Sequence, residues 1–117
     1  MQTPLKLTYR NVESSPEIDA LVEERALWLE GYFPRIIGCR VTVDRPHRRH
    51  SHGNAYQVRV DVSVPGDELI ASRTADEDSG HDSLARAVRD TFHAMRRELE
   101  DWARRVRDGK RQEISVR

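Results

Sequence analysis

The feature that most constrains this chain is a long amphipathic pattern in its C-terminal third. Apolar residues recur there at steps of four or three positions, at Leu84, Val88, Phe92, Met95, Leu99, Trp102 and Val106. This spacing places all of them on one stripe of a helix about six turns long. A helix with a single apolar stripe must bury it against another layer, so the rest of the chain has to supply that layer.

The preceding residues supply the layer as strands. Alternation of apolar and polar residues, typical of strands with one buried face, occurs in three segments, 5–10, 36–45 and 56–64. The tight-turn signal Pro65-Gly66-Asp67 predicts that 68–74 folds back as a fourth strand. After the first strand, Ser15-Pro16-Glu17 is typical of a helix start, and Pro34 ends that helix.

The predicted order is β-α-β-β-β-α, an α+β fold. The strand–helix–strand unit makes its two strands parallel, and the hairpins add antiparallel neighbours. We therefore expect a four-stranded mixed sheet with both helices packed on one face and the other face open. Residues 1–108 are expected to form one domain, and 109–117 a short, polar and disordered tail. The open face should display Lys6, Thr8, Arg10, Arg40, Thr42, Gln57 and Arg59.

Composition excludes several classes of protein. No window approaches the roughly 20 consecutive apolar residues that cross a bilayer, and the N-terminus lacks the apolar stretch of a secretory signal, so we expect a cytoplasmic protein without a membrane partner. The single cysteine, Cys39, excludes an internal disulfide and a multi-thiolate metal site.

The charges are segregated along the chain although 20 basic and 20 acidic residues give a formal net charge of zero. Segments 1–35, 36–64, 65–82 and 83–117 carry balances of −2, +3, −5 and +4. Because charges more than about 10 Å apart are largely screened at physiological salt, local patches decide what a surface attracts. A polyanionic partner is therefore compatible with the neutral total.

Catalytic motifs are missing from the sequence. It has no phosphate-binding glycine loop, no G-x-S-x-G turn and no H-E-x-x-H pair. Cys39 falls on the apolar face of a predicted strand, where a free thiol is more often a small core residue than a nucleophile. We expect no enzyme, no cofactor and no small-molecule substrate.

The segment between the second and third strands contains three imidazoles, from His47, His50 and His52. Three imidazoles could bind zinc or nickel, but Arg48 and Arg49 lie among them and would repel a dication. A solvated basic turn is the simpler interpretation. A third is a nucleic-acid-binding loop, because guanidinium and imidazole groups both donate hydrogen bonds to phosphate.

A second basic cluster lies on the C-terminal helix, beside the apolar stripe. Its members recur at helical spacing and are Arg86, Arg89, His93, Arg96, Arg97 and Arg104. Acidic neighbours at Asp90, Glu98, Glu100 and Asp101 also fit an ordinary charged helix surface. Arginine, however, suits bidentate phosphate contacts and stacking. Together with the sheet face and the histidine loop, this cluster indicates that the partner is a polyanion the size of an RNA rather than a small ligand.

Several short motifs together resemble the ribosome hibernation promoting factor family, also called ribosome-associated translation inhibitors. They span residues 5 to 107 and are Asn11-Val12 before the Ser-Pro-Glu helix start, Leu29-x-x-Tyr32-Phe33-x-x-Ile36, Pro65-Gly66 before Leu69-Ile70-Ala71-Ser72, His81-Asp82, Ala87-Val88 and Arg97-Glu98-Leu99. No single motif is diagnostic, but their order and spacing are specific.

The resemblance implies a domain that sits between the head and body of the small ribosomal subunit. There it would contact rRNA phosphates, occupy the mRNA and tRNA sites and inhibit translation under stress or in stationary phase. The positions that match the family's basic surfaces are Lys6, Arg10, Arg25, Arg40, Arg59, Arg89, Arg96 and Arg97. Arg25 interrupts an apolar stripe, so pairing within the fold is its alternative role.

Together with Arg48, Arg49 and Arg86, these cations are expected to gather into a continuous positive surface. The zero net charge and the acidic stretch from Asp67 to Asp82 leave a second hypothesis open. In that hypothesis the chain is a protein–protein adaptor or self-associating module of the same fold that does not bind ribosomes.

Overall fold

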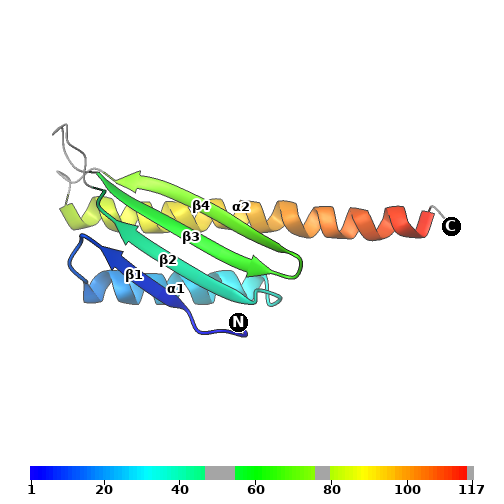
Figure 1. Cartoon of the computed structure of the whole chain (residues 1–117), viewed down its shortest axis with the longest axis horizontal. Helices are drawn as coiled ribbons and strands as arrows, with labels where there is room; N and C mark the ends of the chain where they lie inside the picture. The colour runs from blue at the N-terminus through cyan, green and yellow to red at the C-terminus, as the bar shows by residue number, and fades with distance from the viewer. Residues whose placement is uncertain (47–54, 76–79, 116–117) are drawn as a thin grey trace.

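A computed structural model describes residues 1–46, 55–75 and 80–115 of the chain. The four strands are β1 (Lys6–Arg10), β2 (Gly38–Asp44), β3 (Tyr56–Val64) and β4 (Asp67–Ala75), and the two helices are α1 (Pro16–Tyr32) and α2 (Gly80–Ser115). The sheet order is β1-β2-β3-β4, with β1 parallel to β2 and the other two pairs antiparallel. Both helices lie on one side of the sheet (Figure 1). The predicted α+β fold is confirmed.

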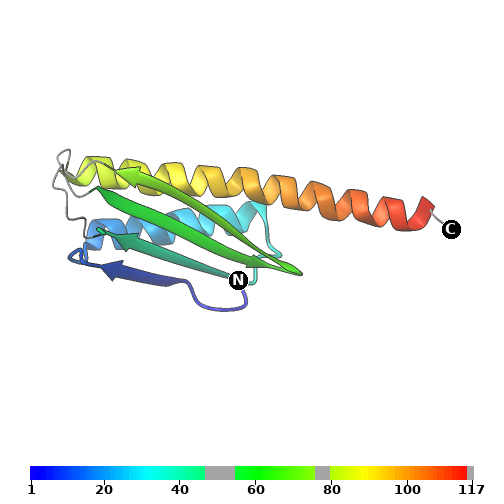
Figure 2. The same ribbon diagram turned by 45° about the horizontal axis from the view of Figure 1, so that its top comes forward.

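The core lies between the sheet and the helices. Val41 and Val60 face each other in register on β2 and β3 and are fully buried. From α2, Phe92 and Met95 are also fully buried, as the apolar stripe predicted. The alternate strand residues point to the opposite side, which no helix covers (Figure 2).

Local chemistry explains where α1 begins. Ser15 has an extended backbone, and its Oγ accepts a hydrogen bond from the Ile18 N–H at 3.4 Å, as an N-cap does. The Tyr9 hydroxyl donates to the Asp19 carboxylate at 2.7 Å and so ties β1 to the first turn of the helix. Burial and this hydrogen bond raise the pKa of Tyr9 to about 12.

The β3–β4 hairpin turns at Pro65-Gly66, as predicted from the sequence. Gly66 has φ of 80°, the positive value that the second central residue of a type II turn requires. This turn sets the register in which Val64 faces Asp67. It thereby places Arg59 and Asp61 on the uncovered side of the sheet, opposite Ser72 and Ile70.

The C-terminal helix departs from the sequence prediction. Instead of ending near Asp108 before a disordered tail 109–117, α2 continues through Gly109 to Ser115. Gly109 costs about 1 kcal/mol relative to alanine inside a helix, and the neighbouring Lys, Arg, Gln and Glu residues favour helix. Consequently α2 extends beyond the sheet (Figure 1), and the longest dimension of the molecule is 60 Å.

Candidate nucleic-acid interface

The uncovered side of the sheet, called here the open face, carries four predicted cations. They are Lys6, Arg10, Arg40 and Arg59, and all four are exposed. Lys6 and Arg40 are direct neighbours in the parallel β1–β2 ladder. They line a hollow of about 370 Å³ together with Thr3, Ser63 and the carboxylate Asp61. Two adjacent cations beside hydroxyl-bearing residues can contact a phosphate group, while Asp61 lowers the positive charge of this hollow.

Arg59 is already paired on this face. Its Nε and Nη2 donate to the two carboxylate oxygens of Asp61 at 2.9 and 3.1 Å, a bidentate arrangement. The carboxylate raises the pKa of the Arg59 guanidinium. Lys6 and Arg40 form no ion pair with any carboxylate among the described residues.

The outer side of α2 carries the second group of predicted cations, called here the helix patch. Its members are Arg86, Arg89 and Arg97, whereas the fourth predicted cation, Arg96, lies toward α1. Arg96 lies 3.8 Å from the Glu100 carboxylate one turn later. Arg86, Arg89 and Arg97 are exposed and make no ion pair within the part of the chain that the structure describes.

Arg25 is held within the fold rather than presented to solvent. Its guanidinium lies 4.8 Å from the centroid of the Trp28 ring and 3.1 Å from the Glu24 carboxylate. The side chain is only 18% exposed, and its buried Nε has no hydrogen-bond partner in the described structure. This placement matches the alternative role, pairing inside the fold, that the sequence left open for Arg25.

The two groups of cations lie on opposite sides of the domain. The open face points away from the helices (Figure 2), whereas the helix patch consists of exposed residues of α2, the helix that buries Val88 and Phe92 against the sheet. A single continuous positive surface, as expected from the sequence, is therefore not formed by the described residues. The domain instead presents one group of cations on each of two sides. Acidic residues lie among both groups, namely Asp44, Asp61 and Glu68 on the open face and Asp90, Glu98, Glu100 and Asp101 on α2.

The sequence reasoning missed an aromatic cluster between the helices. Arg96 lies over the rings of both Tyr32 and Trp28, at 4.1 and 5.5 Å from their centroids. The Trp28 ring also meets the His93 ring edge-on at 5.0 Å. The spacing of Trp28 and Tyr32, one helical turn apart on α1, was the available signal. These contacts join α1 to α2 and orient Arg96.

The remaining candidates divide into two groups. His47, Arg48, Arg49, His50 and His52 lie outside the described residues, so the predictions for this loop stay predictions. Cys39 is 5% exposed, and burial raises the pKa of its thiol to about 12. It therefore packs as a core residue, as expected. Within ranges 1–46, 55–75 and 80–115, no group of three or more His, Cys, Asp or Glu side chains could hold a metal ion.

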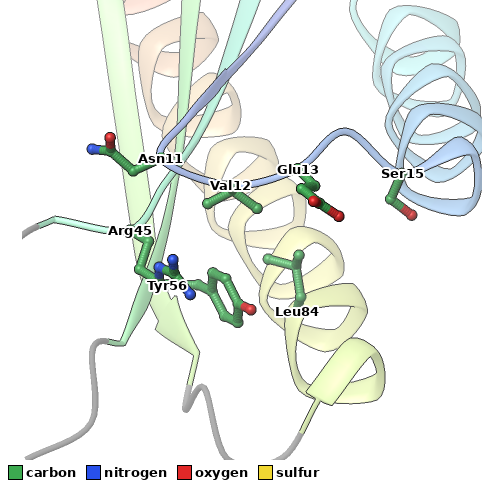
Figure 3. A pocket seen from close by; sticks show the side chains of 7 residues that line it. All are labelled: Asn11, Val12, Glu13, Ser15, Arg45, Tyr56 and Leu84. Carbon is green, nitrogen blue, oxygen red and sulfur yellow. The ribbon is translucent and has the colours of Figure 1, made fainter.

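A pocket of about 680 Å³ opens where β1 and β2 end and α1 begins. Its lining combines Asn11, Val12, Glu13, Ser15, Arg45, Tyr56 and Leu84 (Figure 3). The Ser15 hydroxyl caps α1 and donates to Glu17 at 2.9 Å. The pocket contains none of the open-face or helix-patch cations.

The fold and its two basic sides define a small α+β domain with a candidate nucleic-acid interface. The chain belongs to the family described as sigma 54 modulation protein / S30EA ribosomal protein, which matches residues 5–107. This confirms the family predicted from the sequence motifs. No helix in the described residues is both long and apolar enough to span a membrane.

Solved structures share the fold at low sequence identity. A ribosomal subunit interface protein from Coxiella burnetii is 16% identical with a TM-score of 0.67, and the alignment covers 85% of this chain and 96% of that one. The N-terminal domain of Protein Y from Thermus thermophilus is 19% identical with a TM-score of 0.63, covering 83% and 94%. No curated protein sequence matches the chain significantly.

Proposed function

We propose that this domain binds the small ribosomal subunit through phosphates of its rRNA and inhibits translation by occupying the mRNA and tRNA sites. The observation that carries the proposal is the presence of cations without described acidic partners on two opposed sides, Lys6 and Arg40 on one and Arg89 and Arg97 on the other. Family membership and the names of the two structural relatives support it.

Cations on two opposed sides of the domain suit binding inside a cleft of the RNA better than binding to one flat RNA surface. A domain wedged between two walls of RNA can neutralise phosphates on both, whereas a domain on one duplex uses one side only. The acidic residues then matter little where they face neither wall. This explains how a chain with zero net charge can bind a polyanion.

Inhibition in this proposal needs no chemical step. The domain competes with mRNA and tRNA for the same volume, and phosphate contacts hold it there. The role would be in the cytoplasm, under stress or in stationary phase, when fewer ribosomes translate.

Co-sedimentation with purified small subunits across a salt series tests the proposal. Wild-type protein should sediment with the subunits at low salt and dissociate steeply as salt rises, because phosphate contacts release counterions. Lys6→Glu with Arg40→Glu, and separately Arg89→Glu with Arg97→Glu, should each weaken binding. The proposal fails if the wild-type protein does not sediment, or if neither pair of substitutions changes binding.

A matched control uses two other arginines of α2. Arg104 and Arg105 are already paired with Asp101 and Asp67, at 3.5 and 4.0 Å. Arg104→Glu with Arg105→Glu makes the same change in charge and should weaken binding less. Thermal unfolding of every variant shows whether the fold is retained. Competition with mRNA and initiator tRNA then tests whether the bound domain occupies their sites.

The alternative, a protein–protein adaptor without ribosome binding, is favoured by the pairing of Arg59 with Asp61 and of Arg96 with Glu100. Such pairing lowers the charge available to RNA. In a pull-down, one protein partner at stoichiometric yield without rRNA would support the adaptor and overturn the ribosomal proposal.

A further inference from the structure

A second pocket lies where α1 ends beside α2, apart from the cations discussed above. Its volume is about 430 Å³. The residues that line it are Tyr32, Phe33, Pro34, Arg35, Trp102, Ala103, Val106 and Arg107. It forms where Phe33 and Pro34 of the α1–β2 connection lie near residues 102–107 of α2, at the end of the sheet.

The lining combines aromatic rings with cations. Tyr32, Phe33 and Trp102 provide three rings, while Arg35 and Arg107 are the charged residues among the eight lining positions. Among the residues whose side chains the structure describes, no carboxylate lines this pocket. The Arg35 guanidinium lies 5.7 Å from the centroid of the Trp102 ring. Aromatic rings with guanidinium groups beside them are the arrangement that proteins use for unpaired nucleotides.

The Tyr32 ring is both accessible and held in place. Tyr32 is 54% exposed, which is high for a large ring. Arg96 lies over the ring at 4.1 Å from its centroid, and Trp28 meets it edge-on with centroids 5.6 Å apart. A ring fixed by these contacts loses little conformational freedom when a ligand stacks on it, which favours binding.

We propose that this pocket binds one unpaired nucleotide of RNA, with the base on the exposed Tyr32 ring and a phosphate between Arg35 and Arg107; Trp102, 6% exposed, forms the floor of the pocket. The inference rests on the proposed function, because it names an rRNA feature that the domain would recognise besides duplex phosphates. An apolar peptide fits less well, because it would cover two guanidinium groups without supplying an anion.

Tryptophan fluorescence gives a direct readout. The chain has two tryptophans, so Trp28→Phe leaves Trp102, in the pocket wall, as the sole reporter and keeps an aromatic ring at position 28, beside Tyr32. Titration with a single-stranded RNA of about eight nucleotides should quench the fluorescence of Trp102. This length lies within the range that domains binding single-stranded nucleic acids cover. Failure of this RNA to quench Trp102 overturns the inference.

Two sets of substitutions locate the site in the same reporter protein. Tyr32→Ser should weaken binding of the single-stranded RNA about 5- to 150-fold, the range for loss of one base–aromatic stack. Arg35→Ala with Arg107→Ala should weaken it and flatten its salt dependence. The matched control is Leu27→Ser, which changes another exposed apolar residue of α1 outside this pocket. Equal affinity of Tyr32→Ser and Leu27→Ser would refute the assignment.

Co-sedimentation separates this inference from the proposed function. If wild-type protein sediments with small subunits but the RNA does not quench Trp102, the nucleotide pocket is wrong and the ribosomal function stands. If the RNA quenches Trp102 in a Tyr32-dependent way and no subunit binding occurs, the pocket is correct and the ribosomal function is wrong. A protein partner that protects Trp102 while single-stranded RNA does not would assign the pocket to protein recognition and overturn the inference.

Discussion

Removal of one carboxylate from the open face should strengthen RNA binding. Asp61 accepts both hydrogen bonds from Arg59, and it lies beside Arg40 in the sheet register. Asp61→Asn removes the negative charge next to Arg40 and releases Arg59 from its bidentate pair. Because asparagine keeps a similar shape, the sheet should tolerate the change.

The magnitude follows from the charges on the open face. Its described cations are Lys6, Arg10, Arg40 and Arg59, and its described acids are Asp44, Asp61 and Glu68, so the balance rises from +1 to +2. If Arg59 gains one phosphate contact, the logarithm of the association constant for RNA falls more steeply with the logarithm of the salt concentration, with a slope about 0.7–0.9 larger. At 0.15 M salt this corresponds to roughly fivefold tighter binding. Loss of the ion pair should change the free energy of unfolding little, because solvent screens the exposed Arg59 guanidinium.

The assay is co-sedimentation with small subunits over a potassium chloride series, with wild type and Asp61→Asn compared at each salt concentration. Glu23→Gln is the control, because it removes the same charge from α1, away from the open face. An Asp61→Asn variant that binds more weakly, or with an unchanged salt slope, would contradict the assignment of the open face to RNA. An equal gain in Glu23→Gln would show that net charge, and not this surface, controls affinity.

Four further predictions concern the fold. Since the folded pKa of Tyr9 is about 12 against 10 for the free side chain, its stabilising contribution is complete below pH 10 and lost between pH 10 and 12. Thermal unfolding of Tyr9→Phe should therefore show a smaller loss of stability over that interval than wild type. The Cys39 thiol, with its pKa raised to about 12, should react with a thiol reagent at pH 8 only after denaturation, and fast reaction in the native state would refute its burial. Phe92→Ala should cost about 3–5 kcal/mol in denaturant unfolding, because the ring is fully buried, and a cost below 1 kcal/mol would be inconsistent with that packing. Gly66→Ala should cost about 1–2 kcal/mol by the same measurement, since its φ of 80° is strained for a residue with a Cβ, whereas no cost would argue against this turn.

Much of the fold could be predicted from periodicity. The stripe from Leu84 to Trp102 fixed the side of α2 that is buried, and alternation in β2 and β3 fixed which residues point to the open face. The end of α2 differs from the prediction, because one glycine and a polar composition do not suffice to end a helix. Helix propensity through residues 110–115 offsets the cost of Gly109.

The exposure of several candidate cations could be predicted from the sequence, but their arrangement could not, and their role in binding stays a prediction. Arg40 and Arg59 were expected on the open face and lie there. The division of the cations between two opposed sides requires knowing that both helices cover the same face of the sheet. The contact of Arg25 with Trp28, and of Arg96 with Tyr32, depends on how α1 and α2 pack.

By itself the sequence determined the elements, their order, the parallel β1–β2 pair and the buried side of each element. It could do so because backbone geometry gives strands and helices fixed side-chain periods. Only the tertiary structure decided which charges meet acids, which rings stack and where a pocket opens beside Trp102. Those outcomes depend on distances between residues far apart in the chain, which local periodicity does not encode.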